Sequence, residues 1–352
     1  MRIAWFPKAT DLAGNPYWPL LQQELEALGV EFESSHNSFW LSGAWLWRNR
    51  RRVQVLHFHF IQSHYAVSEE RVSLRRLFKF AAYLVLARLL GYRLIWTMHD
   101  LMPTWPKEPY WIERLARYGI AWLSHDVIVH CKEAQRLLAH EFRRRHRIWV
   151  FPLPSYVEVH PNTITQSEAR RWLGISPERF LIGFIGGIRP NKGLEELLIA
   201  FEHLDSSEAM LLVAGKPWPP VDYVEIITAR CAEDTRIVLR AQHIPDAELQ
   251  YYIQGCDMLV FPFKRVLTSS SVALAMAFGK PVIVPRLGCL PELVGTAGFI
   301  YEPDDEMGLV NALRDAIGND NLESMGTAAA QRVNAYTWRD LAEDTLRVYG
   351  KP

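Results

Sequence analysis

The sequence predicts an α/β protein built from two doubly wound domains. Short apolar runs typical of buried strands alternate with longer amphipathic segments typical of helices. The alternation stops at a proline-rich segment over 152–161 and then begins again. The length of 352 residues also exceeds that of a typical single domain. We therefore expect a first domain over 1–160, a second over 161–335, and a C-terminal helix over 336–352 that packs back toward the first.

Composition narrows the class of protein. Hydrophobic residues make up 49% of the chain, which is ample for two cores, and the formal net charge is zero. A neutral chain has no overall field that attracts nucleic acid, so we expect no nucleic-acid partner. Met1 to Pro7 reads as a strand rather than a signal peptide, and the longest apolar stretch, 78–90, is interrupted by Lys79 and Arg88. These features predict a cytoplasmic protein.

The first domain begins with a predicted strand over 3–6, a turn, and an amphipathic helix over 17–28. In parallel sheets ligands bind at the carboxyl ends of the strands, so Gly14 and Asn15 in the turn lie where a ligand would bind. Alternatively, Gly14 serves only to make the turn.

Two later strands of this domain end in histidine. His57 and His59 end one strand, and their i, i+2 spacing places both on one face. Substrate contact is the functional interpretation; the alternative, which we expect for at least one of them, is a structural histidine with satisfied hydrogen bonds. His99 and Asp100 follow the strand over 93–97, a position typical of groups that exchange protons in catalysis. A histidine bonded to its own loop is the alternative there.

Arginine and aromatic side chains are interleaved in the first domain. The arginine-rich segments are 48–52 and 71–76, and the second opens a predicted helix over 71–91. The neighbouring apolar residues are Trp40, Trp45, Trp47, Leu77, Phe78 and Phe80. This mixture is typical of a membrane-surface helix, so anionic lipid at the inner face of the cell membrane is a predicted partner. The alternative is a solvated basic helix with an ordinary core face.

The second domain opens with a strand and a glycine-rich loop over 185–193. Gly186 and Gly187 permit close approach of a ligand to the backbone, and Arg189 and Lys192 can neutralise a diphosphate. Walker spacing is absent, so the loop is not a P-loop. Two later strands of this domain end near Lys216 and His243.

The segment over 258–285 reads as strand, loop, helix, turn and strand. The hydroxyl cluster from Thr268 to Ser271 is a natural N-cap, and the helix after it is apolar almost all round, which predicts burial. Backbone N–H groups at the start of a helix bind anions, most often phosphate. The alternative is an ordinary capped helix that packs against the sheet.

These motifs together resemble glycosyltransferase family 4, which has the GT-B fold of two Rossmann-like domains facing each other across a cleft. The segments that resemble this family's N-domain histidine motif, donor loop, next strand end and donor-binding core are 97–100, 186–193, 213–215, 244–246 and 275–283. The segments that resemble bacterial exopolysaccharide transferases, including xanthan-type mannosyltransferases, are 15–17, 56–59, 188–193 and 267–271. The likeness extends over nearly the whole chain.

The resemblance implies a hexosyltransferase that moves a sugar from a GDP- or UDP-sugar to a saccharide or polyprenyl-linked acceptor in exopolysaccharide or glycolipid biosynthesis. It implies no cofactor and no metal ion, and the sequence has no Asp-x-Asp motif. The implied catalytic residues are His99 and Asp100. The implied donor-binding residues are Gly14, Gly186, Gly187, Arg189, Lys192, Lys216, His243, Thr268, Ser269, Ser270 and Ser271. The implied acceptor-binding residues are Asn15, Tyr17, His57 and His59.

The sequence departs from this family in the donor region. Family 4 carries two glutamates eight positions apart, and these positions are Val266 and Leu274 here. The arginine expected five residues before Lys192 is Gly187, with Arg189 as its candidate replacement. Nucleotide contacts must therefore differ; retention of stereochemistry is not implied, and the xanthan-type relatives are compatible with inversion. Two alternatives follow: a non-catalytic GT-B-like protein that binds sugar nucleotides, and a GT-B sugar-nucleotide epimerase.

Overall fold

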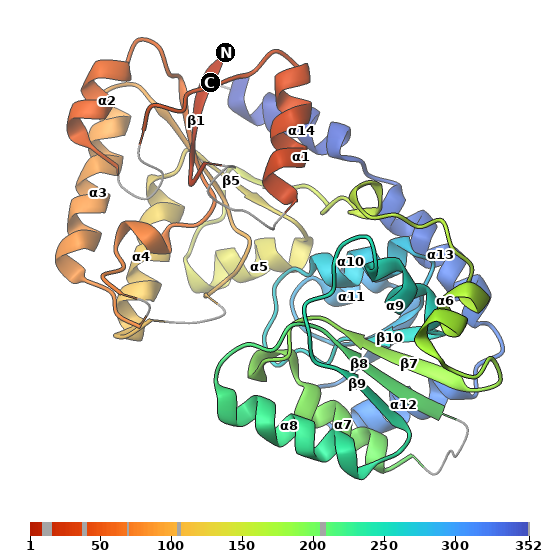
Figure 1. Cartoon of the computed structure of the whole chain (residues 1–352). Helices are drawn as coiled ribbons and strands as arrows, with labels where there is room; N and C mark the ends of the chain where they lie inside the picture. The colour runs from red at the N-terminus through yellow and green to blue at the C-terminus, as the bar shows by residue number, and fades with distance from the viewer. Residues whose placement is uncertain (9–15, 37–40, 69, 104–106, 205–208, 351–352) are drawn as a thin grey trace. The chain divides into compact units, whose positions relative to one another are not determined.

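The computed structural model describes residues 1–8, 16–36, 41–68, 70–103, 107–204 and 209–350. They form two compact units, one made of Met1–Leu153 with Tyr336–Pro352 and the other of Pro154–Ala335. Each unit contains a six-stranded sheet of parallel strands with helices on both faces (Figure 1). The predicted α/β class and the doubly wound architecture are confirmed.

The sheet of the first unit has the strand order β2-β1-β3-β4-β5-β6. Its strands are β1 (Arg2–Phe6), β2 (Glu31–Phe32), β3 (Val55–Phe58), β4 (Arg93–Thr97), β5 (Asp126–Val129) and β6 (Ile148–Val150). Its helices are α1 (Tyr17–Ala27), α2 (Gly43–Asn49), α3 (Leu74–Leu89), α4 (Tyr110–Leu123), α5 (Lys132–Glu141) and α14 (Trp338–Gly350), with a short 3₁₀ turn η2 (Gln62–His64). Strands β3 and β5 are buried along their whole length, which is why the apolar residues Val127 to Val129 of β5 follow one another without alternation.

Helix α14 comes from the far end of the chain and lies beside α1 (Figure 1). Trp5 of β1 donates its indole N–H to the Tyr349 hydroxyl of α14 over 3.0 Å, and both side chains are buried. At the start of α14, the ring of Trp338 lies 5.4 Å from that of Tyr17 in α1. The last helix of the described chain therefore packs as part of the first unit.

The sheet of the second unit has the strand order β12-β11-β10-β7-β8-β9. Its strands are β7 (Phe180–Ile185), β8 (Ala209–Ala214), β9 (Ile237–Arg240), β10 (Met258–Val260), β11 (Val282–Pro285) and β12 (Gly298–Tyr301). Its helices are α6 (Gln166–Leu173), α7 (Leu194–Glu202), α8 (Val221–Glu233), α9 (Leu249–Gly255), α10 (Ser270–Ala277), α11 (Leu290–Val294), α12 (Gly308–Ile317) and α13 (Leu322–Asn334). One hydrophobic core lies under α7 and α12 and another under α9, α10 and α13, on opposite faces of the sheet (Figure 1).

Helix α3 is shorter than the predicted 71–91. It begins at Leu74 because the Ser73 hydroxyl accepts a hydrogen bond from the N–H of Arg76 and so caps the first turn. Among the described residues, no helix combines the length and the apolar character needed to cross a bilayer.

The apolar residues that the sequence groups with the arginines divide into two sets. Trp45, Leu77 and Phe80 are only 3–6% exposed, so the prediction that they form part of a surface patch is wrong. Trp47 and Phe78 are 58% and 62% exposed. Helical periodicity explains the division, because successive turns of one helix present different side chains to the core. Trp40 lies outside the described residues.

Candidate functional site

The glycine-rich loop follows β7 in the second unit. It contains the 3₁₀ turn η4 (Pro190–Lys192), and Gly193 joins this turn to α7 with a left-handed φ of 72°. A Cβ atom on Gly193 would lie 1.7 Å from the carbonyl oxygen of Pro262, in the loop after β10. Only glycine therefore fits here, and the loops at the ends of β7 and β10 lie in direct contact.

Backbone hydrogen bonds join this loop to its neighbours. The N–H of Ile188 donates to the carbonyl of Lys216 over 2.9 Å, and the N–H of Trp218 donates to the carbonyl of Ile188 over 3.1 Å. The N–H of Lys264 donates to the carbonyl of Asn191 over 3.2 Å. The loops after β7, β8 and β10 thus form one assembly at the carboxyl edge of the sheet, where ligands bind in such folds.

This assembly brings together the predicted donor-binding residues Gly186, Gly187, Arg189, Lys192 and Lys216. The Lys192 ammonium lies 4.5 Å from the ring centre of Phe263, and that of Lys216 lies 4.8 Å from the ring centre of Trp218. His243 is exposed after β9, the outer strand of the sheet. Strand β9 pairs with β8, so His243 follows the neighbour of the strand that ends near Lys216.

Arg189 differs from the other arginines of this unit. Its side chain is half-buried, and burial lowers the pKa of its guanidinium. Within the described part of the chain it has no carboxylate partner, and its Nε atom is buried without a hydrogen bond. Arg236, by contrast, is paired with Asp234 over 2.6 Å. A desolvated cation without a partner destabilises a fold, so this arrangement is typical of a site that receives an anion.

The N-terminus of α10 stands at the end of the loop after β10. The Ser269 hydroxyl accepts a hydrogen bond from the N–H of Val272 over 3.3 Å, which confirms the predicted N-cap. Ser270, the first helical residue, is exposed, and Thr268 and Ser271 are partly exposed. The first N–H groups of a helix have no intrahelical partner, so they are available to an anion at this end of α10.

Four imidazoles gather at the carboxyl ends of β3, β4 and β5 in the first unit. They belong to His57, His59, His99 and His130, which we call the histidine cluster. Ring centres of His57 and His59 lie 4.2 Å apart, those of His59 and His99 5.4 Å, and those of His99 and His130 5.5 Å. No group of three or more His, Cys, Asp or Glu side chains in the described ranges has metal-binding geometry.

His57 is the member of the histidine cluster with a structural role. It is fully buried, with Nδ1 2.7 Å from the Tyr349 hydroxyl and Nε2 2.7 Å from Thr97 Oγ1. Because Trp5 already donates to the Tyr349 oxygen, the Tyr349 proton is directed to Nδ1, and His57 Nε2–H donates to Thr97. Both ring nitrogens are then satisfied, so His57 takes the structural alternative that the sequence left open.

His59 and His99 form a direct pair, with His59 Nδ1 3.1 Å from His99 Nε2. His99 is partly exposed, and the ring of Tyr17 packs edge-on 4.8 Å from it. Asp100 follows His99 and is also partly exposed. Of the predicted residues near this site, Gly14 and Asn15 lie outside the described residues.

His130 is a member of the cluster that the sequence-based site did not include. Its Nδ1 lies 3.0 Å from the carbonyl of Phe151, which can only accept, so Nδ1 carries the proton. Its Nε2 therefore presents a lone pair, and this buried atom has no hydrogen-bond partner among the described residues. His130 directly follows β5, so the strand-end position that identified His99 would also have identified it.

In the comparisons with known proteins, a family model matches part of the second unit. Residues 179–319 match the family model described as Glycosyl transferases group 1. This match lies within the second unit, and together with the relatives below it shows that the chain is a glycosyltransferase.

Relatives of this glycosyltransferase extend the likeness to the first unit. GDP-mannose:glycolipid 4-beta-D-mannosyltransferase of Xanthomonas campestris pv. campestris is 25% identical, with 76% of this chain and 72% of the relative covered. D-inositol 3-phosphate glycosyltransferase of Nocardia farcinica is 24% identical, with 94% and 69% covered.

Solved structures show the fold of the whole chain. Sucrose-phosphate synthase from Thermosynechococcus elongatus has a TM-score of 0.74 at 16% identity, covering 99% of this chain and 98% of that chain. Anabaena HepE in complex with UDP and glucose has a TM-score of 0.69 at 17% identity, covering 99% of both chains. The predicted GT-B fold is confirmed.

Val266 and Leu274 occupy the two positions where the glycosyltransferase resemblance leads us to expect glutamates. Both are partly buried and pack against the core beneath α10. The loop between them is further fixed by Gly288, where a Cβ would lie 2.6 Å from the carbonyl oxygen of Val266. Neither side chain can hydrogen-bond a ribose, so these two positions cannot make the ribose contact that glutamates would make.

The second unit of this glycosyltransferase also contains a cavity of about 640 Å³ beside α7 and α12. Its charged lining is mainly acidic, with Glu196, Asp304, Asp305 and Glu306 against Lys264 and His203. None of the predicted donor-binding residues lines it. An acidic lining repels a diphosphate, which favours the loops after β7, β8 and β10 as the donor site.

Burial keeps the histidine cluster of this glycosyltransferase neutral. It lowers the pKa of His57 to about 3 and of His130 to about 4, and it lowers the pKa values of His59 and His99 well below the ordinary value. Desolvation disfavours the charged imidazolium, and neighbouring imidazoles add repulsion to all but His130. At neutral pH these rings therefore act as neutral donors and acceptors.

The depressed pKa values predict acid sensitivity of folding. An unfolded histidine titrates near pH 6.5, so below that pH the unfolded chain binds protons that the folded cluster excludes. The free energy of unfolding should therefore fall as pH falls from about 6.5 toward 4, by up to about 1.4 kcal/mol per pH unit for each histidine. Urea titrations at successive pH values measure this slope. His130→Gln should reduce it, and a slope of zero would contradict the buried neutral cluster.

Proposed function

We propose that this glycosyltransferase is a metal-independent hexosyltransferase that takes a sugar from a GDP- or UDP-sugar. Arg189 carries the proposal, because it is a half-buried cation without a carboxylate partner among the described residues, inside the segment that matches the family model. Arg189, Lys192 and the α10 N-terminus supply positive charge at the carboxyl edge of one sheet. Such groups stabilise the nucleoside diphosphate as it leaves, which is the work a metal ion does elsewhere.

A charge reversal at the α10 N-terminus tests where the diphosphate binds. Ser270→Glu places a carboxylate at an exposed first helical position, where a negative charge favours the helix, so folding should be preserved. Affinity for GDP or UDP should fall at least about tenfold through charge repulsion. Ser270→Ala is the matched control and should be mild, because the backbone does the binding. If calorimetry shows that Ser270→Glu binds GDP or UDP with normal affinity, the diphosphate does not bind at this helix.

The catalytic role in the proposal belongs to His99 and Asp100 in the first unit. His99 is the partly exposed member of a neutral histidine cluster. A neutral imidazole can accept the proton of an acceptor hydroxyl or donate a hydrogen bond to the sugar. The ring of His130 lies next to that of His99, and its Nε2 lone pair can also accept a proton.

A lipid-linked or saccharide acceptor completes the proposed reaction. One relative is named a glycolipid mannosyltransferase and another an inositol phosphate glycosyltransferase. We place the enzyme in the cytoplasm, bound to the inner face of the cell membrane. The surface that supports this placement spans α3 and the adjacent α4. Its exposed apolar residues are Phe78, Val85, Leu89, Trp111, Leu115, Tyr118 and Trp122.

Vesicle binding tests the proposed membrane contact. Arg71 and Arg75 are exposed at the start of α3, and each basic residue near anionic lipid contributes about 1 kcal/mol. Wild-type protein should co-sediment with anionic vesicles, and salt should weaken the binding. Arg71→Glu with Arg75→Glu should abolish it, while Arg136→Glu on α5 should not. A wild-type protein that ignores anionic vesicles at low salt would favour a soluble acceptor.

The rival function is a protein that binds sugar nucleotides without turnover. Val266 and Leu274 favour it, because both family glutamates are replaced by core-packing side chains. The two functions differ in one observable: a binding protein retains nucleotide affinity yet releases no nucleoside diphosphate from any donor.

A further inference from the structure

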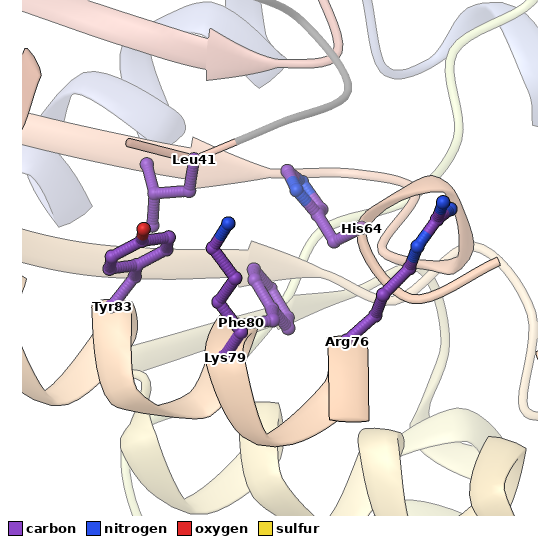
Figure 2. Close-up of a pocket in the computed structure, with 6 residues that line it drawn as sticks. All are labelled: Leu41, His64, Arg76, Lys79, Phe80 and Tyr83. Carbon is purple, nitrogen blue, oxygen red and sulfur yellow. The ribbon is translucent and has the colours of Figure 1, made fainter. Parts of the chain in front are cut away.

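A small pocket lies between the η2 turn and α3 in the first unit, apart from the candidate donor and histidine sites. Figure 2 shows the six side chains that line it: Leu41, His64, Arg76, Lys79, Phe80 and Tyr83. Four of them lie on α3 at i, i+3, i+4 and i+7 spacing, which places them on one face of the helix. The pocket has a volume of about 20 Å³.

His64 is the buried polar group in this pocket. It is 5% exposed, and its ring stacks on Phe80 with centres 4.4 Å apart and planes inclined by 5°. Neither ring nitrogen has a hydrogen-bond partner among the described residues. Burial lowers the pKa of His64 to about 3, so at neutral pH the ring offers one N–H donor. A buried donor left unsatisfied destabilises a fold, and a ligand that accepts from it removes that cost.

The charges around His64 select an anion. Among the described residues, the lining contains two cations and no carboxylate. Arg76 donates from its guanidinium to the carbonyl of Ala66, which holds the charge beside the pocket. The Lys79 ammonium lies 5.7 Å from the ring centre of Tyr83, and in Figure 2 the Lys79 side chain lies beside Phe80.

We propose that this pocket binds the phosphate group of a ligand. A volume of about 20 Å³ holds one water-sized group, so a single phosphoryl oxygen can enter and accept from the His64 imidazole. The remaining oxygens then stay at the mouth, where Arg76 and Lys79 form charge-assisted hydrogen bonds with them. The phosphate belongs either to a soluble ester or to a lipid headgroup, and exposed Phe78 on α3 lies close enough in sequence to accompany a headgroup.

Calorimetry with inorganic phosphate tests the pocket. Wild-type protein should bind phosphate saturably at constant ionic strength held with chloride. Lys79→Gln and His64→Phe should each weaken binding about tenfold or more, since each removes one hydrogen-bonding group. His64→Phe keeps an aromatic ring against Phe80, and Lys79→Gln changes an exposed side chain. Arg136→Gln, on α5 and outside the pocket, should bind as wild type.

Vesicles containing phosphatidic acid identify the source of the phosphate. Binding that inorganic phosphate displaces, and that Lys79→Gln loses while Arg136→Gln retains, indicates a lipid headgroup. Calorimetric binding without such vesicle binding indicates a soluble ester. Wild-type protein that does not distinguish phosphate from chloride, or pocket variants that bind phosphate as wild type does, would overturn the proposal and leave a water molecule as the occupant.

Discussion

Replacing Arg189 with alanine should weaken binding of a nucleoside diphosphate by about 1.5–3 kcal/mol, or roughly 10- to 150-fold in Kd. The free energy of unfolding should stay the same or rise. The wild-type guanidinium is half-buried without a carboxylate partner in the described part of the chain, so its removal relieves desolvation. A loss of binding with no loss of stability is the pattern expected of a ligand-binding group.

Lys192→Ala should reduce affinity in the same range, because its ammonium lies in the same loop, 4.5 Å from the ring centre of Phe263. Arg230→Ala is the control. Arg230 is bonded to Glu202 over 2.8 Å on the α8 side of the unit, and its loss should leave nucleotide affinity unchanged. Calorimetry with GDP and UDP, together with thermal unfolding, measures both quantities. If both Arg189→Ala and Lys192→Ala bind GDP and UDP with unchanged affinity, the diphosphate does not bind at this loop.

Replacing His99 with alanine should lower kcat about 10²- to 10⁴-fold while leaving donor affinity nearly unchanged. The imidazole stands at the end of β4, is partly exposed, and is paired with His59 over 3.1 Å. A group that acts on the reacting atoms lowers turnover when it is removed, whereas the proposed diphosphate site lies in the other unit. Steady-state kinetics separate kcat from KM, and circular dichroism verifies folding.

The control for this variant is His140→Ala, an exposed histidine beside Glu141 on α5. Its kinetics should match wild type. Asp100→Asn tests the neighbouring carboxylate in the same assay. Equal turnover in His99→Ala and wild type would assign the chemistry to another group, and His130, whose buried Nε2 has no hydrogen-bond partner among the described residues, would be the next residue to replace.

Local patterns predicted the parts of the fold and site that depend on nearby residues. The apolar run that forms β5 follows from burial on both faces. The cap at Ser269 follows from hydroxyl chemistry within one turn. Gly193 was predicted only as part of a glycine-rich loop; its contact with Pro262 joins positions far apart in sequence.

Features that depend on long-range packing could not be predicted in this way. The hydrogen bond between Tyr349 and His57 joins opposite ends of the chain, so the sequence could not show which histidine was structural. Whether Arg189 has a carboxylate partner depends on every residue that surrounds it in space. The same holds for Trp45, whose burial depends on how α2 packs.

The central claim is sugar transfer from a nucleotide donor, and a transfer assay tests it most directly. Purified protein is incubated with radiolabelled GDP-mannose or UDP-glucose and a membrane extract that supplies lipid-linked acceptors. The proposal predicts that label enters the lipid fraction, that nucleoside diphosphate is released in equal amount, and that His99→Ala abolishes both. Donor that binds to the wild-type protein but is neither transferred nor cleaved, with every donor and acceptor fraction offered, would contradict it.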